Sequence, residues 1–457
     1  MVISLIYNDG LISPPVVQSQ PPLPVDTDHF IISFDILLIK SSNILKVTEP
    51  CYAFDFSRAD INSILYYMSN SFLTSCFLHT DVESVWNIIK SVILSSMHQY
   101  IPKYRLKSHK SPRWFTSEIR HLLNCVRSLH KKYKTHPTQN NFNHLKSAES
   151  HLQQKILNAK TDYEQALVNN CSSNTSKLFQ YINSVTCSKS IPLTMHYDST
   201  SAFSNFDKAC LFNNFFFSVF NNESGTINLD SIPFSSQTLS NITFSESDVY
   251  DALTSLEPNK AIGIDDIGPN ILKVCASLLH KPLHYLFTLS IHQCKLPSEW
   301  LIHCITPVFK SGNKNSVKNY RPISLLCNTS KVLEKIIYDK IIEFVSKSIS
   351  SAQFGALKGR STIQQLLVFL HQVVNSTMQT DVIYLDIQKV FDSIPHCELL
   401  TKLWSFGITG RLWRWFRCYL SDRTQVVGIN NVLSTPYQFF LEFPREISLD
   451  LSYFLFT

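Results

Sequence analysis

Glycine is scarce in this chain of 457 residues, which has ten glycines, eight of them at or after Gly263. Glycine supplies backbone conformations that tight turns need, so this distribution predicts a largely helical first part and a strand-containing last two-fifths. The closest two of the 12 cysteines, Cys294 and Cys304, are ten residues apart, so zinc-site spacing is absent. Free thiols are therefore expected, in an intracellular protein of the nucleus or cytoplasm.

Signals for the membrane or for secretion are also lacking. No uncharged apolar run reaches the length of a membrane span, so no membrane partner is expected. The first residues lack the positively charged region of a signal peptide. Hydrophobic residues make up 44% of the chain and charged residues 17%, which is typical of a folded protein of two to four domains.

Positive charge is concentrated in residues 103–134, which hold ten Lys or Arg and a single acid, Glu118. This pattern has two interpretations, a solvated helix face or a phosphate-binding surface. In the second, Tyr104, Trp114 and Tyr133 would be available to stack on bases.

Apolar residues at three- and four-residue steps predict a series of helices. The predicted ranges are 61–72, 85–97, one that opens over residues 112–118 and continues through the basic stretch, 140–168, 246–256, 270–279, 330–345, 362–374 and 411–420. A phenylalanine cluster between Phe212 and Phe220 predicts a further helix face that is buried. Short strands are expected at residues 305–310 and from Arg423.

One short apolar run, Val382 to Ile387, predicts a buried strand with Asp386 near its end. A buried carboxylate is unfavourable unless it is paired or binds a metal ion. The alternative is that Asp386 caps a following turn.

Four segments in order carry a resemblance. They are Asn319-Tyr-Arg-Pro-Ile-Ser-Leu-Leu326, Gln353-Phe-Gly-Ala-Leu-Lys-Gly-Arg-Ser-Thr362, Leu385-Asp-Ile-Gln-Lys-Val-Phe-Asp392 and Tyr419-Leu-Ser-Asp-Arg-Thr-Gln-Val426. Their succession resembles the reverse transcriptase of LINE-type (non-LTR) retrotransposons, over roughly residues 245–440. The resemblance implies an α+β fold, with a helical N-terminal region followed by the fingers and a partial palm of a right-hand polymerase.

The same resemblance implies RNA-directed DNA synthesis on an RNA template from a DNA primer, with Mg²⁺ as cofactor. Asp386 would be catalytic and would bind Mg²⁺ together with the Ile387 carbonyl. Lys310, Arg321 and Phe391 would contact the incoming nucleotide, with Phe391 rejecting a 2′-hydroxyl. Lys358 and Arg360 would lie along the template.

The chain also departs from the family pattern. Asp265-Asp266 precedes Asp386 by about 120 residues, whereas the family's aromatic-x-Asp-Asp pair follows that strand. No such pair is found after Asp386, and the match decays from Phe443. We therefore expect a truncated, inactive copy. The alternatives are a non-catalytic RNA- or DNA-binding protein that uses residues 103–134 and the fingers, or a translated remnant without function.

Near the N-terminus, Asp28-His29 precedes an apolar run to Phe34. The pair resembles the last motif of AP-endonuclease-like nucleases, in which the His is a general base and the Asp orients it. The expected organisation is an endonuclease remnant at 1–40, a helical linker at 50–240 and a reverse transcriptase domain at 245–457. Nothing in the sequence determines the oligomeric state.

Overall fold

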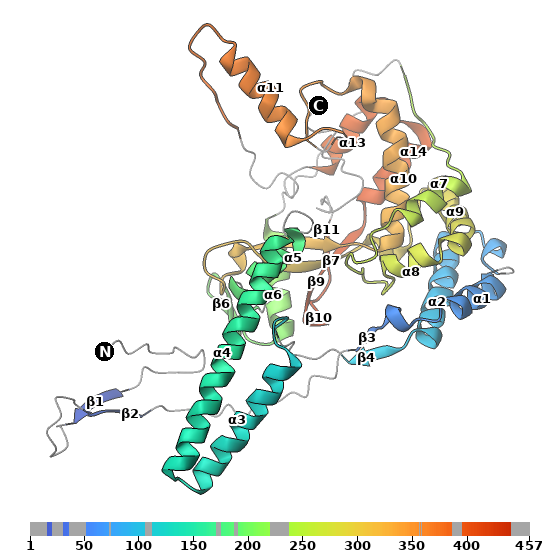
Figure 1. Cartoon of the computed structure of the whole chain (residues 1–457). Helices are drawn as coiled ribbons and strands as arrows, with labels where there is room; N and C mark the ends of the chain where they lie inside the picture. Colours follow the sequence, from blue (N-terminus) through green and yellow to red (C-terminus); the bar gives the residue numbers. More distant parts are fainter. Residues whose placement is uncertain are drawn as a thin grey trace. The chain divides into compact units, whose positions relative to one another are not determined.

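The computed structural model describes residues 16–20, 31–35, 52–72, 75–105, 112–170, 175–186, 191–219, 237–355, 357, 359–385 and 395–439. The chain divides into two compact units. The first comprises Met1–Phe54 and Lys103–Lys110, and the second comprises Asp55–Pro102 and Ser111–Thr457. The second unit mixes helices with a sheet, which agrees with the expected α+β class (Figure 1).

The first unit contains two small antiparallel pairs of strands. β1 (Val16–Gln20) pairs with β2 (Ile31–Asp35), and β3 (Tyr52–Phe54) pairs with β4 (Lys103–Arg105). β2 confirms the strand expected in the apolar run. Asp28 and His29 lie outside the described residues, so the nuclease remnant stays a prediction.

The second unit opens with helices that begin where the sequence offers a cap. They are α1 (Ile61–Phe72), α2 (Val82–Tyr100), α3 (Ser117–Thr135), α4 (Gln139–Asn169), α5 (Thr175–Thr186) and α6 (Asn205–Ser218). The Asp60 carboxylate accepts from the Ser63 amide at 3.1 Å, and Asp81 accepts from the Ser84 amide at 3.0 Å. These bonds satisfy amides that have no partner within the first turn. The helices predicted in this region are therefore confirmed.

A mixed sheet forms the centre of the second unit. Its strands are β7 (Ile302–Phe309), β8 (Tyr320–Leu325), β9 (Arg423–Ile429), β10 (Val432–Leu433) and β11 (Tyr437–Phe439). β7 is antiparallel to β8 and parallel to β9, while β10 and β11 both pair with β9. Phe212 and Phe216 of α6 are buried against Ile305 and Val427 of the sheet. The expected buried phenylalanine face is thus confirmed.

Further helices belong to the second unit. They are α7 (Glu246–Thr254), α8 (Pro269–Val274), α9 (Ala276–Gln293), α10 (Asn328–Val345), α11 (Thr362–Val374), α13 (His396–Ser405) and α14 (Gly410–Leu420). α7 and α11 each begin with a capping box, formed by Ser245 with Asp248 and by Ser361 with Gln364. A small hairpin, β5 (Met195–Tyr197) with β6 (Thr200–Ala202), precedes α6.

α2 packs against the part of the chain that resembles a polymerase. Trp86 meets Trp300 edge to face with ring centroids 5.1 Å apart. The Glu299 carboxylate pairs with Lys90 and accepts from Trp86 Nε1. The Glu83 carboxylate accepts from the Ser298 amide at 2.8 Å. Part of the region predicted as a linker therefore belongs to the same compact unit as the sheet.

The prediction of a buried strand at Val382–Ile387 is wrong for residues 382–385, the part that the structure describes. Residues 382–385 have no regular structure, and the exposed fractions of Ile383 and Leu385 are 83% and 91%. No described strand pairs with this segment. An apolar run becomes a buried strand only when neighbours satisfy its backbone and cover its side chains.

Candidate nucleotide and nucleic-acid interface

The β7–β8 hairpin carries two predicted nucleotide-contacting residues on one face. Val308 lies opposite Arg321 in the antiparallel register, and the Lys310 amide donates to the Asn319 carbonyl at 2.8 Å. Side chains alternate along a strand, so Lys310 and Arg321 are diagonal neighbours on the same face. Both are exposed, and neither forms an ion pair with a carboxylate of the described residues.

The opposite face of the hairpin is anchored in the core. Tyr320, the neighbour of Arg321, is 7% exposed, and its ring lies 4.9 Å from Phe212 and 5.5 Å from Phe309. Burial on this side raises the pKa of the Tyr320 hydroxyl. Tyr320 faces α6, and side chains alternate between the two faces of a strand. Lys310 and Arg321 therefore lie on the outward face of the hairpin.

The loop that joins β7 to β8 is held by its own hydrogen bonds. Gly312 adopts φ +88°, a conformation that favours glycine. The Asn313 side chain accepts from the Asn315 amide at 2.9 Å, and Asn319 Nδ2 donates to the Asn313 carbonyl at 2.9 Å. Tyr320 OH donates to the Lys314 carbonyl at 2.8 Å. The loop thus has a defined shape.

The basic residues of this loop are not equivalent. Lys318 pairs with Asp198 at 2.8 Å, and that hydrogen bond raises the pKa of the Lys318 ammonium. Lys314 lies over the Phe309 ring at 5.4 Å. The positive charges of Lys310 and Arg321 are therefore not neutralised by any carboxylate of the described residues.

Arg360, a predicted template contact, is engaged with its own loop. Its guanidinium donates to the carbonyls of Ser351, at 2.6 Å, and Gln353, and it lies 5.5 Å from the Phe354 ring centroid. Gly359 beside it has φ +84°. Arg360 thus fixes the turn before α11. Lys358 lies outside the described residues, and the template role of both residues stays a prediction.

The predicted catalytic residue, the predicted metal ligands and one predicted nucleotide contact fall in a single stretch after Leu385. Asp386, Ile387 and Phe391 all lie in residues 386–394, outside the described part of the chain. Within the ranges that the structure describes, no cluster of three or more His, Cys, Asp or Glu could hold a metal ion. No described helix is long and apolar enough to cross a membrane.

A buried polar network behind the hairpin was missed by the sequence analysis. Arg423 of β9 donates from Nε to the Tyr419 carbonyl at 2.6 Å, contacts His303 of β7 and stacks on the Tyr419 ring at 4.2 Å. Glu334 of α10 accepts from Ser330 Oγ at 3.0 Å. Burial raises the pKa of Glu334 and of Tyr419, and it lowers the pKa of His303. The network joins β7, β9, α10 and α14.

The Asp265-Asp266 pair has a structural role. Asp265 is 1% exposed and accepts from the Ile267 amide at 3.4 Å. Burial, with Glu299 as a further contributor, raises the pKa of Asp265 to about 7. Gly263 lies so close to Cys327 that a Cβ at Gly263 would come within 2.8 Å of the Cys327 backbone. The pair is thus part of a tightly packed turn.

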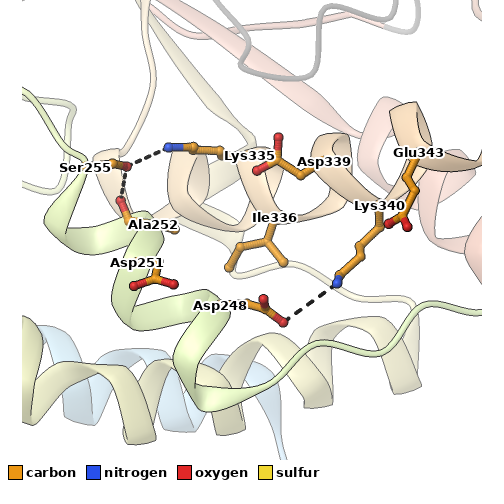
Figure 2. Close-up of a pocket in the computed structure, with 9 residues that line it drawn as sticks. All are labelled: Asp248, Asp251, Ala252, Ser255, Lys335, Ile336, Asp339, Lys340 and Glu343. Atoms are coloured by element: carbon orange, nitrogen blue, oxygen red, sulfur yellow. Dashed lines mark hydrogen bonds and ion pairs between the residues drawn. The ribbon is translucent and has the colours of Figure 1, made fainter. Parts of the chain in front are cut away.

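A cavity of about 410 Å³ lies between α7 and α10. Its charged lining comprises four carboxylates and two lysines: Asp248, Asp251, Asp339, Glu343, Lys335 and Lys340 (Figure 2). Both lysines are already engaged, Lys340 with Asp248 at 3.9 Å and Lys335 with Ser255 Oγ at 2.6 Å. The excess of carboxylates disfavours phosphate groups, so this cavity is not a nucleotide site.

Comparison with known proteins identifies the domain around the hairpin. Residues 311–440 match the family described as reverse transcriptase (RNA-dependent DNA polymerase). This chain carries a reverse transcriptase domain. The match contains Arg321, Arg360, Asp386 and Phe391, and it begins one residue after Lys310.

The relatives are named as RNA-directed DNA polymerases of transposons and mobile elements. The chain is 27% identical over 197 residues to the probable RNA-directed DNA polymerase from transposon BS of Drosophila melanogaster, covering 41% of this chain and 21% of the relative. It is 26% identical over 200 residues to the probable RNA-directed DNA polymerase from transposon X-element of the same species, covering 42% and 22%. It is 27% identical over 207 residues to the RNA-directed DNA polymerase from mobile element jockey, also from that species, covering 43% and 22%.

These relatives confirm the expected non-LTR type of reverse transcriptase domain. The chain spans about a fifth of the length of these relatives, 21% to 22%. Asp28 and His29 lie far from the matched residues 311–440 of the reverse transcriptase domain. The endonuclease remnant, the truncation and the loss of activity stay predictions.

Proposed function

We propose that this reverse transcriptase domain takes part in RNA-directed DNA synthesis by a non-LTR retrotransposon, extending a DNA primer on an RNA template. The main support for this proposal is the family match at 311–440. The β7–β8 hairpin adds to it because Lys310 and Arg321 are both exposed on one of its faces. Residues of the β7–β8 hairpin form the fingers, and the segment around Asp386 belongs to the palm.

The hairpin would bind the triphosphate of the incoming nucleotide. A guanidinium makes paired hydrogen bonds to phosphate oxygens, and a nearby ammonium adds charge that stabilises the transferring phosphoryl group. Lys310 and Arg321 are diagonal neighbours without a described carboxylate partner, so their charge is free to act on a ligand. The fixed loop between β7 and β8 reduces the entropy lost on binding.

Asp386 and the Ile387 carbonyl would hold Mg²⁺, which prefers hard oxygen ligands. When bound, the metal would lower the energy of nucleotidyl transfer by stabilising charge on the attacking and leaving oxygens. The Phe391 ring would lie beneath the sugar and reject a 2′-hydroxyl. Lys358 and Arg360 would position the template strand.

Primer extension on poly-A with oligo-dT and Mg²⁺ tests this proposal. The sequence predicts no extension by this chain alone, because the family's aromatic-x-Asp-Asp pair is not found after Asp386. Extension that Asp386→Ala abolishes, and that Arg321→Ala weakens mainly through a higher KM for the nucleotide, would overturn that prediction and support the active site proposed here. Lys318→Ala is the matched control because its charge is already paired with Asp198. Extension that survives Asp386→Ala would contradict the proposed role of Asp386.

A second candidate is nucleic-acid binding without catalysis. The basic charge of residues 103–134 favours it. The expected inactivity is decided by the same assay, since a soluble, folded sample that binds template and primer but extends nothing would support this second candidate.

A further inference from the structure

α3 and α4 form an antiparallel two-helix hairpin (Figure 1). Its apolar seam includes the buried residues Ile119, Leu145 and Leu152. The seam is closed near the loop by Tyr133 and Phe142, whose ring centroids lie 5.6 Å apart. These contacts make the hairpin a packed element with one face committed to its interior.

The outward face of α3 carries four cations in a row. Arg120, Arg127, Lys131 and Lys134 are all exposed, at steps of seven, four and three residues. Such steps return to the same side of a helix. The seam residues Ile119 and Tyr133 each adjoin a stripe residue in sequence, so they lie about 100° around the helix from it. At 1.5 Å per residue, this cationic stripe extends for about 21 Å.

Acidic residues are segregated away from the cationic stripe. Residues 119–148 contain six Lys or Arg and no Asp or Glu. The flanking Glu118 pairs with Lys155 at 2.7 Å, and Glu164 accepts from Tyr181 OH at 2.5 Å. Within the described residues, no carboxylate forms an ion pair with the stripe. A merely solvated helix face usually mixes both signs of charge, so this segregation points to an anionic ligand.

We propose that the cationic stripe of α3 binds the phosphate backbone of a nucleic-acid duplex. A duplex carries one negative charge per about 1.7 Å of its axis, so the stripe would lie along about 12 phosphate charges. Lysine and arginine at this spacing would contact backbone phosphates and read no sequence. The site lies outside the matched residues 311–440, so it does not rest on the polymerase proposal. It rests on the second candidate above, nucleic-acid binding through residues 103–134, and narrows that candidate to one helix face and one class of ligand.

The surroundings of the stripe favour a nucleic acid over an anionic membrane. Peripheral membrane helices insert large apolar side chains below the headgroups. α3, which carries the stripe, exposes no large hydrophobic side chain, and the two exposed on the hairpin, Leu157 and Val168, lie on α4. Tyr133, considered above as a stacking residue, packs on Phe142 within the seam. Binding is therefore expected to be electrostatic and steeply dependent on salt.

Fluorescence anisotropy with a labelled RNA duplex of about 20 base pairs, from about 50 to 200 mM salt, tests the proposal. The test variant is Arg127→Gln/Lys131→Gln/Lys134→Gln, which keeps good helix formers at exposed positions. Each phosphate contact contributes about 0.9 to the slope of log affinity against log salt, so we expect the slope to flatten by about 2 to 3. Circular dichroism is expected to show unchanged helicity.

The matched control is Lys260→Gln/Lys281→Gln/Arg414→Gln, which removes three exposed cations elsewhere. We expect it to keep the wild-type slope. Equal slopes for the stripe variant and the wild type would overturn the proposal. So would binding to phosphatidylserine-containing vesicles that is tighter than binding to the duplex. Nucleotide binding through Lys310 and Arg321 is expected to survive the stripe variant, which separates failure of this site from failure of the polymerase proposal.

Discussion

Two parts of the reverse transcriptase domain depart from the usual pattern, in which charged side chains are exposed and large apolar side chains are buried. Around β7 and β9, charged residues are buried, with Arg423 and Glu334 each 1% exposed. In α11 and the segment after it, apolar residues are exposed, including Leu367 at 61% and Leu385 at 91%. The family match at 311–440 covers most of both parts.

The difference lies in the available partners. Arg423 has a carbonyl, a ring and an imidazole around it. Glu334 accepts from the Ser330 hydroxyl and lies near the positive charge of Arg423, which partly offsets the cost of its burial. The apolar side chains of α11 have no comparable cover among the described residues, since none of its residues is buried. Three experiments test this comparison, from the largest expected effect to the smallest.

The largest effect is expected for Arg423→Ala. The substitution leaves the Glu334 carboxylate buried without its nearby cation, and it removes the bond to the Tyr419 carbonyl. We expect the free energy of unfolding to fall by about 3 to 5 kcal/mol, measured by urea denaturation. The exposed Arg414→Ala is the control, and Arg423→Met/Glu334→Leu is expected to recover part of the loss. A loss below about 1 kcal/mol would show that the network contributes little.

Asp265 is expected to make stability depend on pH. Its pKa is about 7 in the folded protein against an ordinary value of 3.8, so the folded state binds its proton more tightly. Stability from this group is therefore present below about pH 4 and is lost as the pH rises to about 7. The difference corresponds to about 4 kcal/mol at most, so Asp265→Asn is expected to be the more stable protein at pH 8.

Urea denaturation of both proteins from about pH 3.5 to pH 8 measures this effect, since that range includes both pKa values of Asp265. The two curves are expected to converge toward low pH, where Asp265 is protonated in both states. Parallel curves would mean that Asp265 ionises normally in the folded protein.

The smallest effect is expected at α11. Leu367→Ala changes an exposed residue to a strong helix former, so we expect a change within about 0.5 kcal/mol. Leu403→Ala on α13 is the matched control: Leu403 is 0% exposed, and its truncation is expected to reduce stability by about 2 to 5 kcal/mol. Similar losses at both positions would show that a partner covers α11 in solution.

Local elements could largely be predicted from the sequence because their signals are local. Asp60, Asp81, Ser245 and Ser361 begin helices through bonds to amides within three residues. The order of the four motifs predicted the reverse transcriptase domain, and the comparisons confirm it. Lys310 and Arg321 were predicted only through the family resemblance, and the strand register of the structure adds that they share one face.

Tertiary structure decided which groups are buried. Arg423 and Glu334 lie 89 residues apart in sequence, and no local pattern relates them. Val382–Leu385 has the composition of a buried strand, yet it is exposed because no described strand pairs with it. Composition fixes what a segment prefers, whereas burial depends on partners that distant parts of the chain bring to it.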